Sequence, residues 1–299
     1  MDRFSAMAAF VAVVDEAGFA AAARKLGQSP PAVTRAVAEL ESRMGVRLLT
    51  RTTRSVRLTE AGTRYAADCR RILADVADSE ASTIGTHSQP RGHLVITAPV
   101  LFGRMYVMPI VAEYLERYAE TDVSCWYVDR VVNLIEEGID VAVRIGDLAD
   151  SSLQAVGVGR VDRVVCASRR YLKRYGVPRE PRELGEHRIV SAGAVTPTQE
   201  WSFVADGRPL RVRVRPRLAT TSNDSAIVAA LGGFGITRVL SYQIAEYIEA
   251  GKLERMLEKY EPPPLPIHVV HREGRHAAQK ARAFVDLAVE RLRADASLH

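Results

Sequence analysis

Thr34 and Arg35 are the residues whose types and position most clearly suggest a chemistry. They follow a Gly-Gln-Ser-Pro-Pro turn inside an alanine-rich segment. An arginine can donate two parallel hydrogen bonds to guanine, and a threonine offers its hydroxyl or methyl group to a base edge. Pro30 and Ala32 can contact a thymine methyl group. The set suits the major groove of duplex DNA, although an ordinary helical hairpin with a solvated arginine is the alternative.

The segment Phe19 to Ala38 contains the signals needed to hold these side chains on a helix-turn-helix. Gly27 can adopt the left-handed conformation that ends a helix, and Ser29 can cap the next helix. Pro30 suits a first helical position because no backbone donor is needed there. Inward-facing positions of the second helix, spaced at i, i+4 and i+7, are Val33, Val37 and Leu40.

The stretch 46–62, VRLLTRTTRSVRLTEAG, predicts a two-stranded wing behind this helix pair. Between residues 24 and 57 there are eight basic and two acidic residues, a balance of +6 against +5 for the whole chain. Basic character is therefore concentrated here, as expected for a surface that binds phosphates, whereas a solvated basic loop is the simpler reading. The residues at the predicted wing tip are Arg51, Thr52, Thr53 and Arg54.

A long helix is predicted after the wing, with Thr59 as its cap and residues 61–87 compatible with helix. Apolar residues recur on it with the 4, 3, 4 spacing of a seam between packed helices. We expect a second copy of the chain to bury this seam; packing on the same chain is the alternative. The residues of the seam are Tyr65, Cys69, Ile72 and Val76. We expect Cys69 to be a buried apolar residue rather than a disulfide partner.

Beyond the breaker sequence THSQPRG at 86–92, strand and helix patterns alternate, which predicts parallel sheets with helices on their faces. The expected strands are 93–98, 122–128, 139–145, 161–167, 188–191, 201–204 and 267–271. The expected helices are 104–118, 131–137, 169–174, one after Ser222, and 277–293.

Ligands bind at the carboxyl ends of strands in such sheets, which selects a set of candidate binding residues. Asn223 and Asp224 lie at a helix start, so they could cap that helix instead of binding a ligand. Arg144 could likewise form an ion pair with Asp140 or Asp147 instead of binding a ligand. Gly232, Gly233 and Gly235 follow a helix, so they do not form a dinucleotide motif. The candidates are Thr97, Ala98, Pro99, Val100, Leu101, Tyr127, Arg144, Ile145, Gly146, Ser222, Asn223 and Asp224.

Several function classes are disfavoured by the sequence. The three cysteines and seven histidines have no metal-ligand spacing, so no metal and no cofactor are expected. Patterns for a catalytic nucleophile, paired histidines or a P-loop are missing, which argues against an enzyme. No apolar run is long enough to span a bilayer, and the first 14 residues do not resemble an export signal. We therefore expect a cytoplasmic protein rather than an enzyme or a secreted solute-binding protein.

Nearly the whole chain resembles the LysR-type transcriptional regulators. The matching pieces are AAARKLGQSPPAVTRAVAELE, MGVRLLTRTTRSVRLTEAG, TAPVLFGRMYVMPIV, EEGIDVAVRIGDLADSSL and HVVHREG. The resemblance implies an α/β protein with a winged helix-turn-helix domain (1–58), a linker and dimerisation helix with a hinge (59–89), and a periplasmic-binding-protein-like effector domain (90–299). In that last domain, subdomain I would comprise about 90–162 and 268–299, and subdomain II about 163–267.

The same resemblance implies a sequence-specific transcription regulator whose partners are double-stranded DNA, a small-molecule effector and itself, as a homodimer that can pair into a dimer of dimers. One departure concerns Pro99, Val100 and Leu101, where many carboxylate-binding relatives place Ser or Thr. This departure weakens the case for a carboxylate effector, although backbone donors and Arg144 remain available. A DNA-packaging protein without an effector is the third option, but it leaves the long α/β region unexplained.

Overall fold

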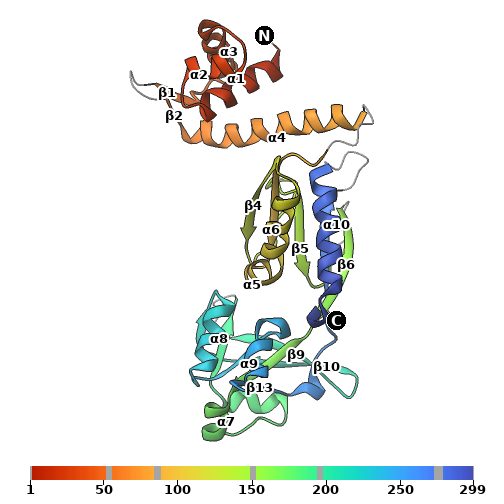
Figure 1. Ribbon diagram of the computed structural model, residues 1–299. Coiled ribbons are helices and arrows are strands. Elements are labelled where there is room, and N and C mark those ends of the chain that lie inside the picture. The colour runs from red at the N-terminus through yellow and green to blue at the C-terminus, as the bar shows by residue number, and fades with distance from the viewer. Residues whose placement is uncertain are drawn as a thin grey trace. The chain divides into compact units, whose positions relative to one another are not determined.

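The computed structural model describes residues 2–51, 56–83, 89–148, 153–193, 198–272 and 279–298. The chain forms two compact units, Met1–His93 and Leu94–His299, both shown in Figure 1. Within the described ranges, no helix is long and apolar enough to cross a membrane.

The first unit contains three short helices, a two-stranded antiparallel ribbon and one long helix. Its elements are α1 (Arg3–Asp15), α2 (Phe19–Lys25), α3 (Pro30–Met44), β1 (Leu49–Arg51), β2 (Val56–Leu58) and α4 (Glu60–Thr83). Gly27 has φ 64° directly after α2, and the Ser29 hydroxyl caps α3 by accepting from the Ala32 amide at 3.4 Å. Both turn signals predicted from the sequence are confirmed, and Val33, Val37 and Leu40 are fully buried.

The first half of α4 completes the core of this unit. Thr59 caps the helix by accepting from the Gly62 amide at 2.9 Å, as predicted. Cys69 is fully buried, and the Tyr65 ring lies 5.8 Å from the ring of Phe10 on α1. Ile72 packs against the same core. Cys69 is therefore covered within its own chain, where α1 packs on α4, and this was the alternative to a second copy. Tyr65 and Ile72 contact the same core but remain partly exposed.

The second unit contains two five-stranded sheets, and we call each sheet with its helices a lobe. The first lobe has strand order β4-β3-β5-β14-β6. Its elements are β3 (Gly92–Ala98), α5 (Val100–Phe102), the π-helix η1 (Gly103–Val107), α6 (Met108–Arg117), β4 (Thr121–Tyr127), β5 (Val141–Ile145), β6 (Leu153–Val161), β14 (Leu265–Arg272), α10 (Gln279–Ala294) and η5 (Ala296–Leu298).

Helices α6 and α10 pack on each other and on one face of the first lobe's sheet (Figure 1). Their contact includes the rings of Tyr114 and Phe284, 5.5 Å apart, and a hydrogen bond from the Tyr114 hydroxyl to the Lys280 carbonyl. On the sheet's other face, Val132 and Leu134 bury a smaller apolar cluster with Val270. The expected helix 131–137 is wrong: the segment forms turns, held by Asn133 accepting from the amides of the two residues that follow Leu134.

The second lobe has strand order β11-β8-β12-β7-β13. Helix α8 packs on one face of this sheet, and the hairpin β9-β10 places Trp201 and Phe203 against the other. Asp206 and Gly207, with φ 50° and 73°, form the hairpin turn. The elements are β7 (Arg163–Ser168), α7 (Arg169–Tyr175), η2 (Pro181–Glu186), β8 (Ile189–Ala192), β9 (Gln199–Ala205), β10 (Arg208–Val214), β11 (Pro216–Thr220), α8 (Asn223–Leu231), β12 (Ile236–Leu240), η3 (Ser241–Gln243), α9 (Ala245–Glu249), β13 (Leu253–Met256) and η4 (Glu258–Tyr260).

Both sheets are mixed, so the expectation of parallel sheets is wrong in part. Strands β3 and β5 are parallel, as are β8, β11 and β12, but β14 runs antiparallel to β5 and β6. Strand β7 runs antiparallel to β12 and β13. The chain leaves the first lobe along β6 and returns along β14, so the outgoing and returning strands lie side by side in opposite directions. Strand β6 was not predicted because its sequence, LQAVGVGRV, contains two glycines.

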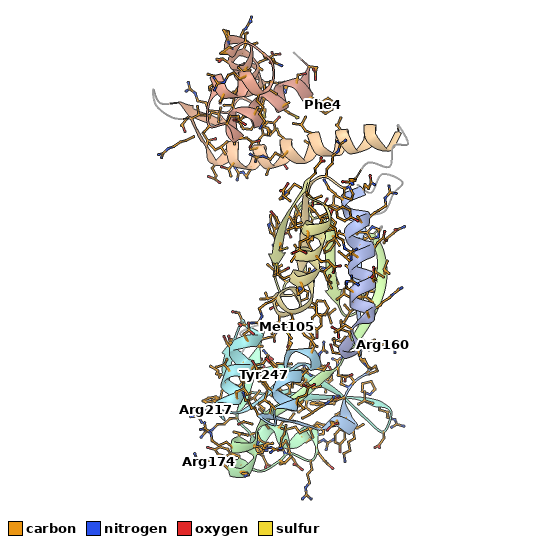
Figure 2. All side chains as sticks on the ribbon, viewed as in Figure 1. Phe4, Met105, Arg160, Arg174, Arg217 and Tyr247 are labelled. Carbon is orange, nitrogen blue, oxygen red and sulfur yellow. The ribbon has the colours of Figure 1, made fainter. Side chains whose placement is uncertain are left out.

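Three aromatic rings join the two lobes. Tyr242, from η3 of the second lobe, meets the rings of Phe102 and Tyr106 from the first at 5.3 and 5.7 Å, both edge to face. Phe102 and Tyr106 stack on each other at 4.7 Å. Figure 2 shows Met105 and Tyr247 in the same region, and both pack against the core shared by the lobes.

Candidate nucleic-acid interface and ligand cleft

The start of α3 presents the predicted DNA-reading residues on an exposed face. Ser29, Pro30 and Arg35 are exposed, while Ala32 and Thr34 are partly exposed. The Thr34 hydroxyl donates to the Pro30 carbonyl at 2.9 Å, so its proton is used within the helix. A base can therefore meet the methyl group or the lone pairs of Thr34, whereas Arg35 retains the donors that match guanine.

The ribbon β1-β2 is anchored to α3 by a carboxylate. Glu41 accepts from the amides of Leu48 and Leu49 at 2.7 and 3.0 Å, so one of the two acids in the basic region is turned towards the backbone. Arg47 and Arg57 remain exposed on this unit. Of the predicted wing tip, Thr52, Thr53 and Arg54 lie outside the described residues, and Arg51 is described as backbone only.

The predicted seam residues differ in their surroundings. Burial raises the pKa of Tyr65 to about 12 and also raises the pKa of the Cys69 thiol. A buried thiol with a raised pKa has little thiolate, so Cys69 has the inert character expected of an apolar core residue. Val76 is partly exposed further along α4 and is not part of the core that contains Tyr65 and Cys69.

A cavity of about 470 Å³ lies between the two lobes of the second unit. Its volume is within the range typical of small-molecule sites, roughly 300–1,000 Å³. The lining residues come from strand ends and helix starts of both sheets. They are Pro99, Val128, Asp129, Arg130, Val131, Arg144, Ile145, Arg163, Ala192, Asn223, Arg238, Val239, Leu240, Tyr242, Gln243 and Leu265.

Four of the twelve predicted binding residues line this cavity: Pro99, Arg144, Ile145 and Asn223. Arg144 does not form the ion pair with Asp140 or Asp147 that was weighed as its alternative role. It donates to the carbonyls of Val132 at 3.0 Å and Arg130 at 3.5 Å, and burial lowers its pKa. Asp140 instead accepts from the Val95 amide at 2.8 Å.

The remaining predicted residues have structural roles around the cavity. Thr97 is fully buried and donates to the Trp126 carbonyl at 2.6 Å, and Ala98 and Leu101 belong to the core. Exposed Val100 donates its amide to Asp129. Tyr127, Gly146, Ser222 and Asp224 do not line the cavity either. The Tyr127 ring fills the space beside Gly103, and Gly146 has φ 111°. Ser222 caps α8, and Asp224 lies 4.0 Å from Arg104.

Most of the second lobe's contribution to the cavity was not predicted from the sequence. The residues are Arg163, Ala192, Arg238, Val239, Leu240, Tyr242 and Gln243. The sequence indicates a strand after Gly235, which the structure shows as β12, but the end of this strand was not among the predicted binding sites. Its carboxyl end, followed directly by η3, satisfies the same rule that selected Pro99 and Asn223. On the first lobe, Val128 and Asp129 line the cavity within the strand end 126–129 that was expected to form one wall, whereas Arg130 was missed.

The charge of the cavity is predominantly positive, with four arginines and one carboxylate, Asp129. Arg130 is paired with Glu137 through two hydrogen bonds of 2.8 and 2.7 Å. Arg238 lies with its guanidinium carbon 4.9 Å from the ring centroid of Trp201. Burial, and secondarily the charge of Arg163, lower the pKa of Arg238. The described residues contain no cluster of three or more histidine, cysteine, aspartate or glutamate side chains that could hold a metal ion.

Known proteins match both units of the chain. Residues 4–63 match the model of the bacterial regulatory helix-turn-helix protein, lysR family, and residues 87–293 match the LysR substrate binding domain. An HTH-type transcriptional regulator of Xanthomonas campestris pv. campestris is 35% identical over 294 residues, covering 96% of this chain and 85% of the relative. The HTH-type transcriptional activator AaeR of Escherichia coli is 32% identical, covering 96% and 93%.

The solved structures agree with these sequence matches. CrgA, a LysR-type transcriptional regulator from Neisseria meningitidis, superposes with a TM-score of 0.61 at 30% identity, over 98% of this chain and 99% of that chain. The two units of the structure, one with the exposed helix α3 and one with two sheets, correspond to the two matched family models. The chain therefore belongs to the LysR family of transcription regulators, with an N-terminal helix-turn-helix DNA-binding domain and a C-terminal effector-binding domain.

Proposed function

We propose that this regulator reads duplex DNA with Arg35 and Thr34 of α3, and that a small molecule in the cavity between the lobes controls that activity. The observation that carries the proposal is the composition of the cavity wall. Pro99, Asp129 and Ile145 come from one sheet, while Ala192, Asn223 and Arg238 come from the other. A ligand that touches both sheets binds most tightly to one arrangement of the lobes, so it shifts their equilibrium.

Base reading by Arg35 is tested with DNA that the full-length protein selects from a random-sequence duplex library. Arg35→Ala should weaken binding to the selected site by at least tenfold, with a smaller loss on unrelated duplex of the same length. Arg43→Ala, which removes an exposed charge from the end of α3, is the matched control. Equal losses on both duplexes would reduce Arg35 to a phosphate contact.

Control by the cavity is tested by filling it. Ala192→Trp places a large ring at the cavity wall, and Ala205→Trp makes the same change at a residue that does not line it. The small molecules of a chemically diverse library that alter DNA binding by the wild-type protein should lose their effect only in the Ala192 variant. Unchanged responses in Ala192→Trp would place the effector site elsewhere.

We also propose that α4 joins two copies of the chain, with Val76 at the interface together with the exposed parts of Tyr65 and Ile72. The partial exposure of Val76 outside the domain core supports this assignment. Cys69 is fully buried in its own unit and is not part of this interface. A dimer would place two copies of α3 about 34 Å, or a multiple of it, apart along the duplex. Val76→Lys should shift sedimentation towards monomer and weaken binding to paired half-sites. A regulator of this kind acts where the genome is, so we infer that it works in the cytoplasm.

A further inference from the structure

The four arginines of the cavity fall into two groups. Arg130 is neutralised by Glu137, and Arg144 is held by two backbone carbonyls. Arg163 and Arg238 lie on the adjacent strands β7 and β12, where Arg163 is opposite Leu240 and Arg238 is opposite Val165. This register places the two arginines diagonally across the strand pair on one face of the sheet, within reach of each other.

Neither Arg163 nor Arg238 has a carboxylate partner among the residues that the structure describes. Asp162, next to Arg163 in the chain, binds Arg255 at 3.0 Å instead. Arg238 has only a long hydrogen bond of 3.4 Å to the Ser202 carbonyl and the face of the Trp201 ring. Two neighbouring cations at a partly buried wall repel each other; burial, and then this repulsion, lower the pKa of Arg238.

We propose that Arg163 and Arg238 form an anion subsite, which binds the oxyanion group of a small organic acid in the cavity. This inference rests on the proposed use of the cavity as the effector site. A carboxylate or phosphate would accept charge-assisted hydrogen bonds from both guanidinium groups and remove their mutual repulsion. The positive charge is thus supplied by the second lobe, so a carboxylate ligand does not need a serine or threonine at Pro99.

The rest of the cavity fits an organic body rather than an inorganic ion. A volume of about 470 Å³ exceeds the space that one phosphate needs, and apolar side chains line part of it. Among them are Pro99, Ile145, Val239 and Leu265. A molecule with one charged end and a short carbon skeleton would pair the charge with the arginines and bury its carbons against these side chains.

The proximity of Trp201 gives a direct readout in the full-length protein. The chain has two tryptophans, and Trp126 is 49% exposed, so Trp126→Phe leaves Trp201 as the only reporter. The probes are succinate, glycerol phosphate and inorganic phosphate, with succinamide as the uncharged match of succinate. They are titrated at constant ionic strength. We expect the organic anions to change Trp201 emission and raise the unfolding temperature at lower concentration than succinamide or inorganic phosphate.

Three variants test the assignment of the two arginines. Arg163→Gln and Arg238→Gln should each weaken the response to organic anions about tenfold or more, as expected for loss of a charge-assisted hydrogen bond. Arg163→Gln should also raise the unfolding temperature of the ligand-free protein, because Arg238 is no longer repelled, whereas Arg238→Gln also removes the contact with the Trp201 ring. Arg160→Gln, which removes an exposed charge from β6 outside this cavity, should change neither quantity.

The proposal is overturned if succinamide equals succinate, if inorganic phosphate matches the organic anions, or if Arg160→Gln has the same effect as Arg238→Gln. If the cavity is not the effector site, the experiments give a different result from loss of the anion subsite alone. Uncharged compounds that act on DNA binding and are blocked by Ala192→Trp would leave the cavity as the effector site without an anion subsite. Anion responses that depend on Arg163 and Arg238 but never alter DNA binding would retain the subsite and refute its regulatory use.

Discussion

Gly62 lies where the long helix α4 begins against the ribbon of the DNA-binding unit, and no larger residue fits there. A Cβ at this position would lie 2.0 Å from the Leu48 carbonyl oxygen and 3.1 Å from Leu58 Cδ2. Since ordinary contact begins near 3.4 Å, the backbone at Leu48 would have to retreat by about 1.4 Å. The amide of Leu48 is held by Glu41, and its carbonyl accepts from Thr59, so this retreat breaks further contacts.

Gly62→Ala should therefore destabilise the first unit, even though alanine favours helix. The helix gains roughly 0.5–1 kcal/mol from the substitution. Overpacking against backbone costs about 1–3 kcal/mol, and the loosened Leu48 contacts add to it. We expect a net loss of about 1–2 kcal/mol, which lowers the midpoint of thermal unfolding by about 5–10 °C for a unit of this size.

Differential scanning calorimetry of the full-length protein measures the first unit's transition, while tryptophan fluorescence reports only the second unit, which contains both tryptophans, Trp126 and Trp201. Gly185→Ala is the matched control, because nothing lies within 4 Å of a Cβ at that position. A Gly62→Ala variant as stable as the wild type would show that a Cβ fits beside Leu48. A fluorescence transition that falls with the calorimetric one would show that the damage is not confined to the first unit.

Two further changes have expected outcomes. Ser29→Ala removes the cap of α3 and should lower the free energy of unfolding of the first unit by about 1 kcal/mol in urea titrations, whereas exposed Ser42→Ala should not; equal effects would contradict the cap. Glu113 accepts two hydrogen bonds of 2.8 and 2.7 Å from Arg291, which lower its pKa to about 2. The ionised Glu113 therefore contributes fully to the free energy of unfolding above its usual pKa near 4.5, and this contribution is lost as the pH falls through about 2. Glu113→Gln should make the free energy of unfolding less dependent on pH over that range. An unchanged pH dependence would exclude the Glu113–Arg291 ion pair as its source.

The sequence predicted the DNA-binding unit well because its signals are local. Gly27, Ser29 and Pro30 each act within one turn of their own position, and the inward spacing of Val33, Val37 and Leu40 needs no knowledge of the rest of the chain. The seam on α4 shows the limit of such patterns. The spacing of Tyr65, Cys69 and Ile72 predicts that an apolar face is covered, but it does not say by which helix.

The ligand cavity was predicted only in part because it is assembled by strand order. Pro99 and Asn223 follow strands or precede helices that are visible in the sequence, so the rule for strand ends finds them. Arg163 and Arg238 became neighbours only once β7 and β12 were paired antiparallel, which a repeated strand-helix pattern does not predict. The mixed sheets arise from the outgoing and returning crossings, and these depend on partners about 100 residues apart.

The junction around Thr59 and Gly62 has a consequence for how an effector signal can reach DNA. Glu41 ties the ribbon to α3, Thr59 caps α4 onto the backbone of Leu48, and α4 completes the core beneath both. The helix-turn-helix, the ribbon β1-β2 and the packed half of α4 are therefore expected to move together as one rigid body. If two chains meet through α4, as proposed above, we expect a bound effector to change the angle or distance between their two α3 helices. The spacing of the two half-sites would then matter for operator choice as well as their bases.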